Sequence, residues 1–225
     1  MVSGRIDWNR VLLRLFYILF PFFIASVYIM GIYAVYPKEI FVIIGAAMLA
    51  YFFPPAGKES VIPITMGYLL AMNRPVLESV LLVATSIAFV DIDVALFLAW
   101  NFDLALKIPL VGRFIRKVES KGHSIMARRK MLNWSAFLGL VLFVIVPFQG
   151  SGALTTTIIG RMIGMEKFRV FLAITIGALL GCYMIAIGVG YGISYLGLWV
   201  VVPIVALLAI ILFVSTIIRG EKGDK

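Results

Sequence analysis

The chain has 225 residues, a formal net charge of +9, and hydrophobic side chains at 63% of its positions. Soluble domains are about 45–50% apolar, so this composition and the mean hydropathy of +1.08 exclude an ordinary soluble protein. Long continuous apolar runs at 11–36, 76–100 and 198–218 favour membrane-spanning helices, because strands of a membrane barrel would alternate in polarity. We therefore predict an all-α integral membrane protein that forms a single polytopic domain over 1–225.

The first apolar run is expected to stay in the protein as a transmembrane helix. It is too long for a signal peptide, and no small-residue cleavage site follows it before Lys38 and Glu39.

The excess of positive charge predicts the orientation of the chain. Basic residues gather near the N-terminus, in the middle and at the C-terminus: Arg5, Arg10 and Arg14; Lys107, Arg113, Arg116, Lys117, Lys121, Arg128, Arg129 and Lys130; and Arg219, Lys222 and Lys225. Lys and Arg accumulate on the cytoplasmic side of membrane proteins. We expect a multi-pass protein of the inner or plasma membrane with both termini in the cytoplasm.

The middle basic stretch, 101–133, is predicted to lie on the cytoplasmic bilayer surface. Apolar residues such as Leu106, Phe114 and Ile115 stand among its charges, as in an amphipathic interfacial segment. Anionic lipid headgroups are the expected partners of this charge, and nucleic acid is not.

An internal repeat appears when the sequence is shifted by 93 positions. Residues 52–74 then lie over 145–167, and punctuating residues coincide: Pro54 with Pro147, Gly57 with Gly150, Gly67 with Gly160, and Met72 with Met165. Repeats of this kind indicate duplicated structural units.

Each copy combines two short apolar stretches around a Pro/Gly break with one full-length helix. Repeat one, 39–100, has a hairpin at 39–72 and a helix at 76–100; repeat two, 135–196, has a hairpin at 135–165 and a helix at 168–196. Stretches of 12 to 15 residues reach only about 18–22 Å, so each hairpin is predicted to be re-entrant. A re-entrant hairpin ends on the side where it began, so each repeat crosses the membrane once and the second repeat has the opposite orientation to the first. A helix at 198–218 then returns the C-terminus to the cytoplasm. Such paired, interrupted segments are typical of a transporter's midplane site.

The chain resembles the small multidrug export protein family in three segments: PPAGKESVIPITMG, FDLALKIPLVGR and VPFQGSGALTTTIIGRMIGM. That family resembles in turn the DedA superfamily of lipid-handling membrane proteins. The resemblance covers about 39–195, and it implies re-entrant hairpins and transport of lipid-linked phosphates by a flippase or scramblase.

A substrate site is predicted where the two hairpin tips meet. The half-helices that begin after Gly57 and Gly150 would present free N–H groups there, which favours an anion, and Lys58 adds a positive charge. The expected substrate-binding residues are Gly57, Lys58, Gly150, Ser151, Gly152 and Arg161. Lys58 in a solvated loop and Arg161 at the membrane interface are the structural alternatives.

Three acidic residues could couple transport to protons or another ion: Glu59, Asp91 and Asp93. Charges inside a membrane are costly and usually functional. Asp91 and Asp93 are about 200° apart on a helix, so they cannot face one cavity, and Asp91 is the deeper.

The predicted function is a membrane transporter that moves an anionic lipid-linked phosphate or phospholipid, with proton coupling. Efflux of small cations or drugs is the alternative, and a scaffold role is a third. Catalysis is not expected: Ser151 lies in a Gly-Ser-Gly run, but the lone His123 is in the basic segment. No cofactor or metal is expected, and Cys182, the single cysteine, is read as core packing. The substrate, the coupling ion and homo-oligomerisation stay open.

Overall fold

The computed structural model describes residues 8–53, 56–102, 130–146 and 152–197, together with Pro203 and Leu207. All regular secondary structure in these residues is helical, and short turns connect the helices. Several predicted features lie outside them: Gly150 and Ser151, most of the basic stretch 101–133, and the helix at 198–218 except Pro203 and Leu207.

Among the described residues, three helices are long and apolar enough to cross a membrane. They are α1 (Trp8–Val35), α4 (Val76–Trp100) and α9 (Lys167–Leu196). At 1.5 Å per residue they measure about 38–45 Å, more than the hydrocarbon layer of about 30 Å. The prediction of an all-helical chain with these long apolar helices is thus confirmed for the described residues, and their length and composition are consistent with a membrane protein.

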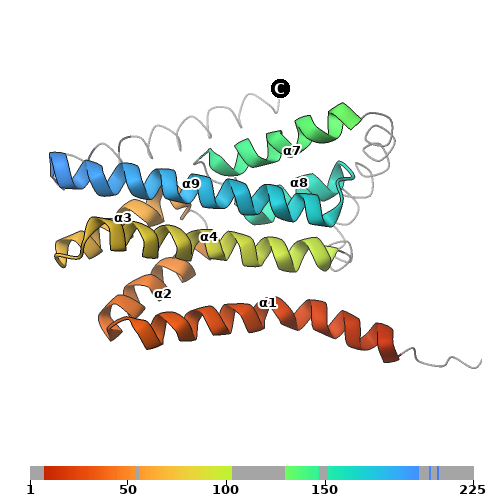
Figure 1. Cartoon of the computed structure of the whole chain (residues 1–225), viewed down its shortest axis with the longest axis horizontal. Coiled ribbons are helices and arrows are strands. Elements are labelled where there is room, and N and C mark those ends of the chain that lie inside the picture. Colours follow the sequence, from red (N-terminus) through yellow and green to blue (C-terminus); the bar gives the residue numbers. More distant parts are fainter. Residues whose placement is uncertain are drawn as a thin grey trace, which may run out of the picture.

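Four shorter helices complete the described part of the chain. They are α2 (Lys38–Phe52), α3 (Lys58–Ala71), α7 (Lys130–Ile145) and α8 (Ala153–Met162). Each measures about 15–24 Å, too short to cross the hydrocarbon layer. In Figure 1, α2 and α3 lie towards the left end of α4 and α9, and α7 and α8 lie towards the right end. Their depth in a membrane and the symmetry of the two halves remain predictions.

The second short helix of each pair ends in the same turn. After α3, the N–H of Arg74 donates to the Leu69 carbonyl over 3.1 Å, and Asn73 has a φ of 57°. After α8, the N–H of Met165 donates to the Gly160 carbonyl over 3.0 Å, and Gly164 has a φ of 86°. This six-residue bond with a left-handed residue is the Schellman motif, which stops a helix by closing its last carbonyls.

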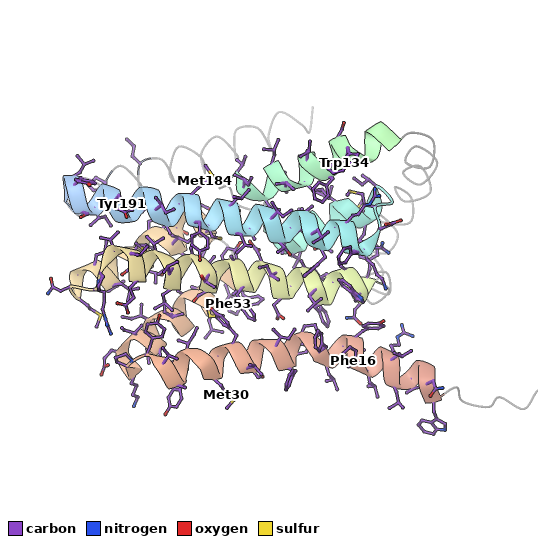
Figure 2. The ribbon with its side chains drawn as sticks, in the orientation of Figure 1. Phe16, Met30, Phe53, Trp134, Met184 and Tyr191 are labelled. Carbon is purple, nitrogen blue, oxygen red and sulfur yellow. The ribbon has the colours of Figure 1, made fainter. Side chains whose placement is uncertain are left out.

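The core lies between α4 and α9, which pack more extensively on each other than any other pair. Small residues on α9 allow α7 to approach closely: a side chain at Gly177 would stand 2.7 Å from the Cβ of Val144. Large apolar side chains instead cover the outside, and Figure 2 labels several exposed ones, such as Met30 on α1 and Met184 on α9. An apolar exterior of this extent is what a lipid solvent requires.

Helix α1 is the most exposed of the three long helices, and one of its polar contacts with α4 lies near its proline. Pro21 has no N–H, so the carbonyl of Tyr17 lacks its usual partner one turn later. The side-chain amide of Asn101, which follows α4, donates to this carbonyl over 2.8 Å.

Candidate functional site

Asp91 is the centre of the candidate site. It lies in the second half of α4 and is only 2% exposed. The hydroxyl of Tyr51, near the end of α2, donates to its Oδ2 over 3.0 Å, and the backbone N–H of Ala153 donates to its Oδ1 over 2.9 Å. One carboxylate thus joins three helices that are distant in sequence.

The contact with Ala153 places a negative charge at the beginning of α8. Ala153 is the first residue of that helix, and the residue before it, Gly152, has an extended backbone. A Cβ on Gly152 would stand 3.4 Å from both the Asp91 carboxylate and the Tyr51 hydroxyl. A carboxylate in this position satisfies an otherwise free N–H and interacts favourably with the helix dipole.

Lys58 supplies the complementary contact at the end of α7. It is the first residue of α3 and is 1% exposed. Its ammonium donates to the carbonyl of Val144, the second-last residue of α7. This carbonyl belongs to the last turn, whose carbonyls have no partner within the helix, so a cation is favourable there.

Lys58 and Asp91 also interact electrostatically with each other, and the thiol of Cys182 lies close to both. Cys182 is fully buried on α9, next to Gly181, where an added Cβ would stand 3.4 Å from the Lys58 ammonium. The site therefore takes residues from six helices, namely α2, α3, α4, α7, α8 and α9.

Glu59 lies beside this group, in the first turn of α3. Its carboxylate folds back over the start of the helix, where a Cβ on Gly57 would overlap it. It interacts electrostatically with Lys58 and Tyr51, and its Oε2 is buried without a hydrogen-bond partner among the described residues. Gly57 therefore provides space for an acidic group at the beginning of α3.

Two predicted site residues lie elsewhere. Arg161, near the end of α8, donates to the carbonyl of Met165 over 2.9 Å and lies 5.3 Å from the ring centre of Phe102. Asp93 belongs to another face of α4 and is partly exposed. The structure thus brings together Gly57, Lys58, Glu59, Asp91 and Gly152, while Gly150 and Ser151 lie outside the described residues.

Sequence reasoning missed Tyr51, the Val144 carbonyl and Gly181, and gave Cys182 only a packing role. A backbone carbonyl and a glycine carry no chemical signal in a sequence. Tyr51 did carry one, because a hydroxyl near the end of a short apolar helix needs a partner when it is buried. Within the described residues, no three side chains of His, Cys, Asp or Glu gather into a group that could hold a metal ion.

Comparison with known proteins adds one match. A family model described as "Putative small multi-drug export protein" matches residues 59–184, which include Glu59, Asp91 and the whole of α8. No curated protein and no solved structure matches the chain. Nothing in these comparisons supports the expected relationship to the DedA superfamily.

Proposed function

Because the chain belongs to the family described as "Putative small multi-drug export protein", we propose that it is a membrane transporter that exports small organic cations in exchange for protons. The family model covers more than half of the chain. Its name agrees better with cation or drug efflux, the alternative from the sequence, than with movement of a lipid-linked phosphate.

The observation that carries the proposal is the position of Asp91. A carboxylate inside a helical membrane protein is costly unless it is used, and this one links the ends of two interrupted helices. Substrate and ion sites of many transporters are built where such helices are broken.

The beginning of α8 and the Lys58 ammonium, which could each have attracted an anion, already have partners within the protein. Asp91 occupies the beginning of α8, and the Lys58 ammonium donates to Val144 at the end of α7. A phosphate would have to compete with a carboxylate for the same N–H. This arrangement gives the lipid-phosphate expectation less support than cation export.

Exchange of a proton at Asp91 would change how these helices are held. The charged carboxylate accepts two hydrogen bonds, and hydrogen bonds to charged groups are worth about 1.5–3 kcal/mol each. A proton on Asp91 weakens both bonds and removes the favourable charge at α8. Protonation and the packing of α2 and α8 against α4 are therefore coupled.

The membrane arrangement belongs to the same proposal. The short helix pairs would enter from opposite sides as inverted, re-entrant hairpins, so that Asp91 lies near the midplane of an inner or plasma membrane. Both termini would lie in the cytoplasm. Binding of the basic stretch to anionic lipids and formation of a homo-oligomer also stay proposals.

Transport in proteoliposomes tests this function. Vesicles with an acidic interior and a clamped membrane potential should accumulate ethidium at a rate that depends on the pH gradient. Asp91→Asn should abolish gradient-driven accumulation, since an amide cannot bind and release the proton.

Glu78→Gln is the matched control, because it also removes one carboxylate from α4. Glu78 is partly exposed and lies 3.5 Å from Arg74 in a surface ion pair, so its loss should leave transport unchanged. If wild-type protein moves ethidium equally fast without a pH gradient, or if the two variants behave alike, proton exchange at Asp91 is wrong.

A further inference from the structure

One row of α4 side chains faces α1. The contacts are Phe89 stacked on Tyr28 with ring centres 4.0 Å apart, Phe97 edge-on to Phe22 at 5.7 Å, and the Asn101 amide on Tyr17. Positions 89, 93, 97 and 101 follow one another at intervals of four residues, and such positions share a helix face. Asp93 therefore lies on the face of α4 that packs against α1.

Asp93 has no polar partner in this interface. Its Oδ1 is buried and has no hydrogen-bond partner among the described residues. In each contact on either side of Asp93, the residue number on α4 and the residue number on α1 add up to about 118, as expected for two antiparallel helices. The same register places Ile24 and Ala25 of α1 opposite Asp93. Both are apolar, so α1 offers no charge to the carboxylate there.

An aromatic cavity of about 140 Å³ that is open on one side lies in the same interface. It is lined by Phe16, Tyr17, Phe20, Pro21, Leu96 and Trp100. Leu96 and Trp100 stand three and seven residues after Asp93, so the carboxylate is on the same side of α4, about one turn away. An apolar cavity of about 150 Å³ takes up benzene, so this one has room for one ring or a substituted ammonium group.

Two aromatic rings of this cavity already contact a cation, which lies outside the cavity lining. The ammonium of Lys167, the first residue of α9, lies 5.6 Å from the ring centre of Tyr17 and 5.5 Å from that of Trp100. Distances within about 6 Å give a favourable attraction between a cation and an aromatic ring. The rings therefore present the electron-rich faces that a cationic ligand requires.

We propose that the α1–α4 interface binds the organic cation that is exported. The aromatic cavity takes the substituted ammonium group of the ligand, and Asp93, about one turn away on α4, supplies the opposite charge. Lys167 is a tethered cation that competes with the ligand for the Tyr17 and Trp100 rings. This inference rests on the proposed function, and it separates two tasks along α4. Asp91 exchanges the proton on one face, and Asp93 holds the cation on the other.

Direct binding tests the site without transport. Equilibrium dialysis of radiolabelled benzyltrimethylammonium against the full-length protein in detergent measures affinity alone. Asp93→Asn should weaken binding at least tenfold, and Trp100→Leu by about three- to thirtyfold, as expected for loss of one cation–π contact. Lys167→Met should tighten binding, because the competing ammonium is gone.

Arg169→Met is the matched control for Lys167. Arg169 also begins α9, but it is half exposed and lies 3.7 Å from Glu166, so its loss should leave binding unchanged. Tighter binding in Lys167→Met but not in Arg169→Met distinguishes competition by a tethered cation from a general loss of positive charge. Equal effects of the two variants would overturn the role of Lys167.

The outcome also separates this site from the proposed function. Asp91→Asn should lose gradient-driven transport, and in that variant an added Asp93→Asn should still weaken benzyltrimethylammonium binding at least tenfold. Binding that depends on Asp93 in a protein without proton-driven transport would keep the site and reject the exchange mechanism. Wild-type affinity in a folded Asp93→Asn variant, checked by its elution profile, would overturn the site itself.

Discussion

Asp91 and Lys58 are buried charges that each meet the end of a helix that stops inside the bundle. Asp91 closes the beginning of α8, and Lys58 closes the end of α7. Removing one member of a buried charge pair leaves the other uncompensated, which is strongly destabilising, whereas removing both costs less. The two residues should therefore act as one unit for folding as well as for transport.

A double-mutant cycle measures this coupling. Lys58→Met and Asp91→Asn should each lower the thermal stability of the detergent-solubilised protein. The double variant should be more stable than the sum of the two losses predicts, by about 0.5–3 kcal/mol, because the residues share a network. Strict additivity would show that Lys58 and Asp91 stabilise the protein independently.

At the scale of elements, the close approach of α7 to α9 positions the acceptor of Lys58. A Cβ on Gly177 would stand 2.7 Å from the Cβ of Val144 and 2.8 Å from the carbonyl of Val141. Gly177→Leu should therefore push α7 away, destabilise the protein by about 1–3 kcal/mol and displace the Val144 carbonyl from Lys58. A thermal-shift measurement on the purified variant checks this.

Gly188→Leu provides the comparison on the same helix. An added Cβ there meets nothing within 4 Å, so the extra side chain should be tolerated. Equal destabilisation by the two substitutions would mean that loss of a glycine in α9, rather than contact with α7, causes the effect.

At the scale of the whole molecule, the two hairpins are predicted to enter the membrane from opposite sides. Met72, at the turn before α4, and Glu166, at the turn before α9, are exposed residues at the mouths of the two helix pairs. In a Cys182→Ser background, Met72→Cys should react with an impermeant thiol reagent from outside intact cells. Glu166→Cys should react only when the cytoplasmic side is opened.

Two further cysteines test the depth of the hairpins. Cysteines at Ala56 and Ser151, near the predicted tips, should resist the same reagent from at least one side. Labelling of Met72→Cys and Glu166→Cys from a single side would contradict the inverted arrangement, whatever the reactivity of the tips.

Much of this architecture can be predicted from the sequence, because lipid offers no hydrogen-bond partners to the backbone. Apolar runs at 76–100 and 168–196 predict α4 and α9 within a residue of their observed bounds, since every backbone group in lipid must be paired within a helix. The partners of Asp91 could not be predicted in the same way. They stand 40 and 62 residues away, one of them is a backbone N–H, and no local pattern encodes such a contact.

The expectation of an anion site shows the same limit. Free N–H groups at a helix start do attract negative charge, but the sequence alone does not say whether a ligand or a carboxylate of the chain provides it. Here Asp91 provides it at α8. The sequence predicts that Asp91 lies deeper than Asp93 and on another face of the helix. Only the packing shows that Asp91 accepts a backbone hydrogen bond and that Asp93 faces apolar side chains.

The bond between Asn101 and Tyr17 also bears on how the chain is made. The carbonyl left open by Pro21 enters the membrane with α1, but its donor lies 84 residues later. At about 5–20 residues per second, the ribosome adds Asn101 to the chain several seconds after Tyr17. An unpaired carbonyl in lipid costs several kcal/mol, so newly made α1 gains by staying beside the insertion machinery until α4 emerges. Biosynthesis then favours joint release of the two helices, with their interface already assembled.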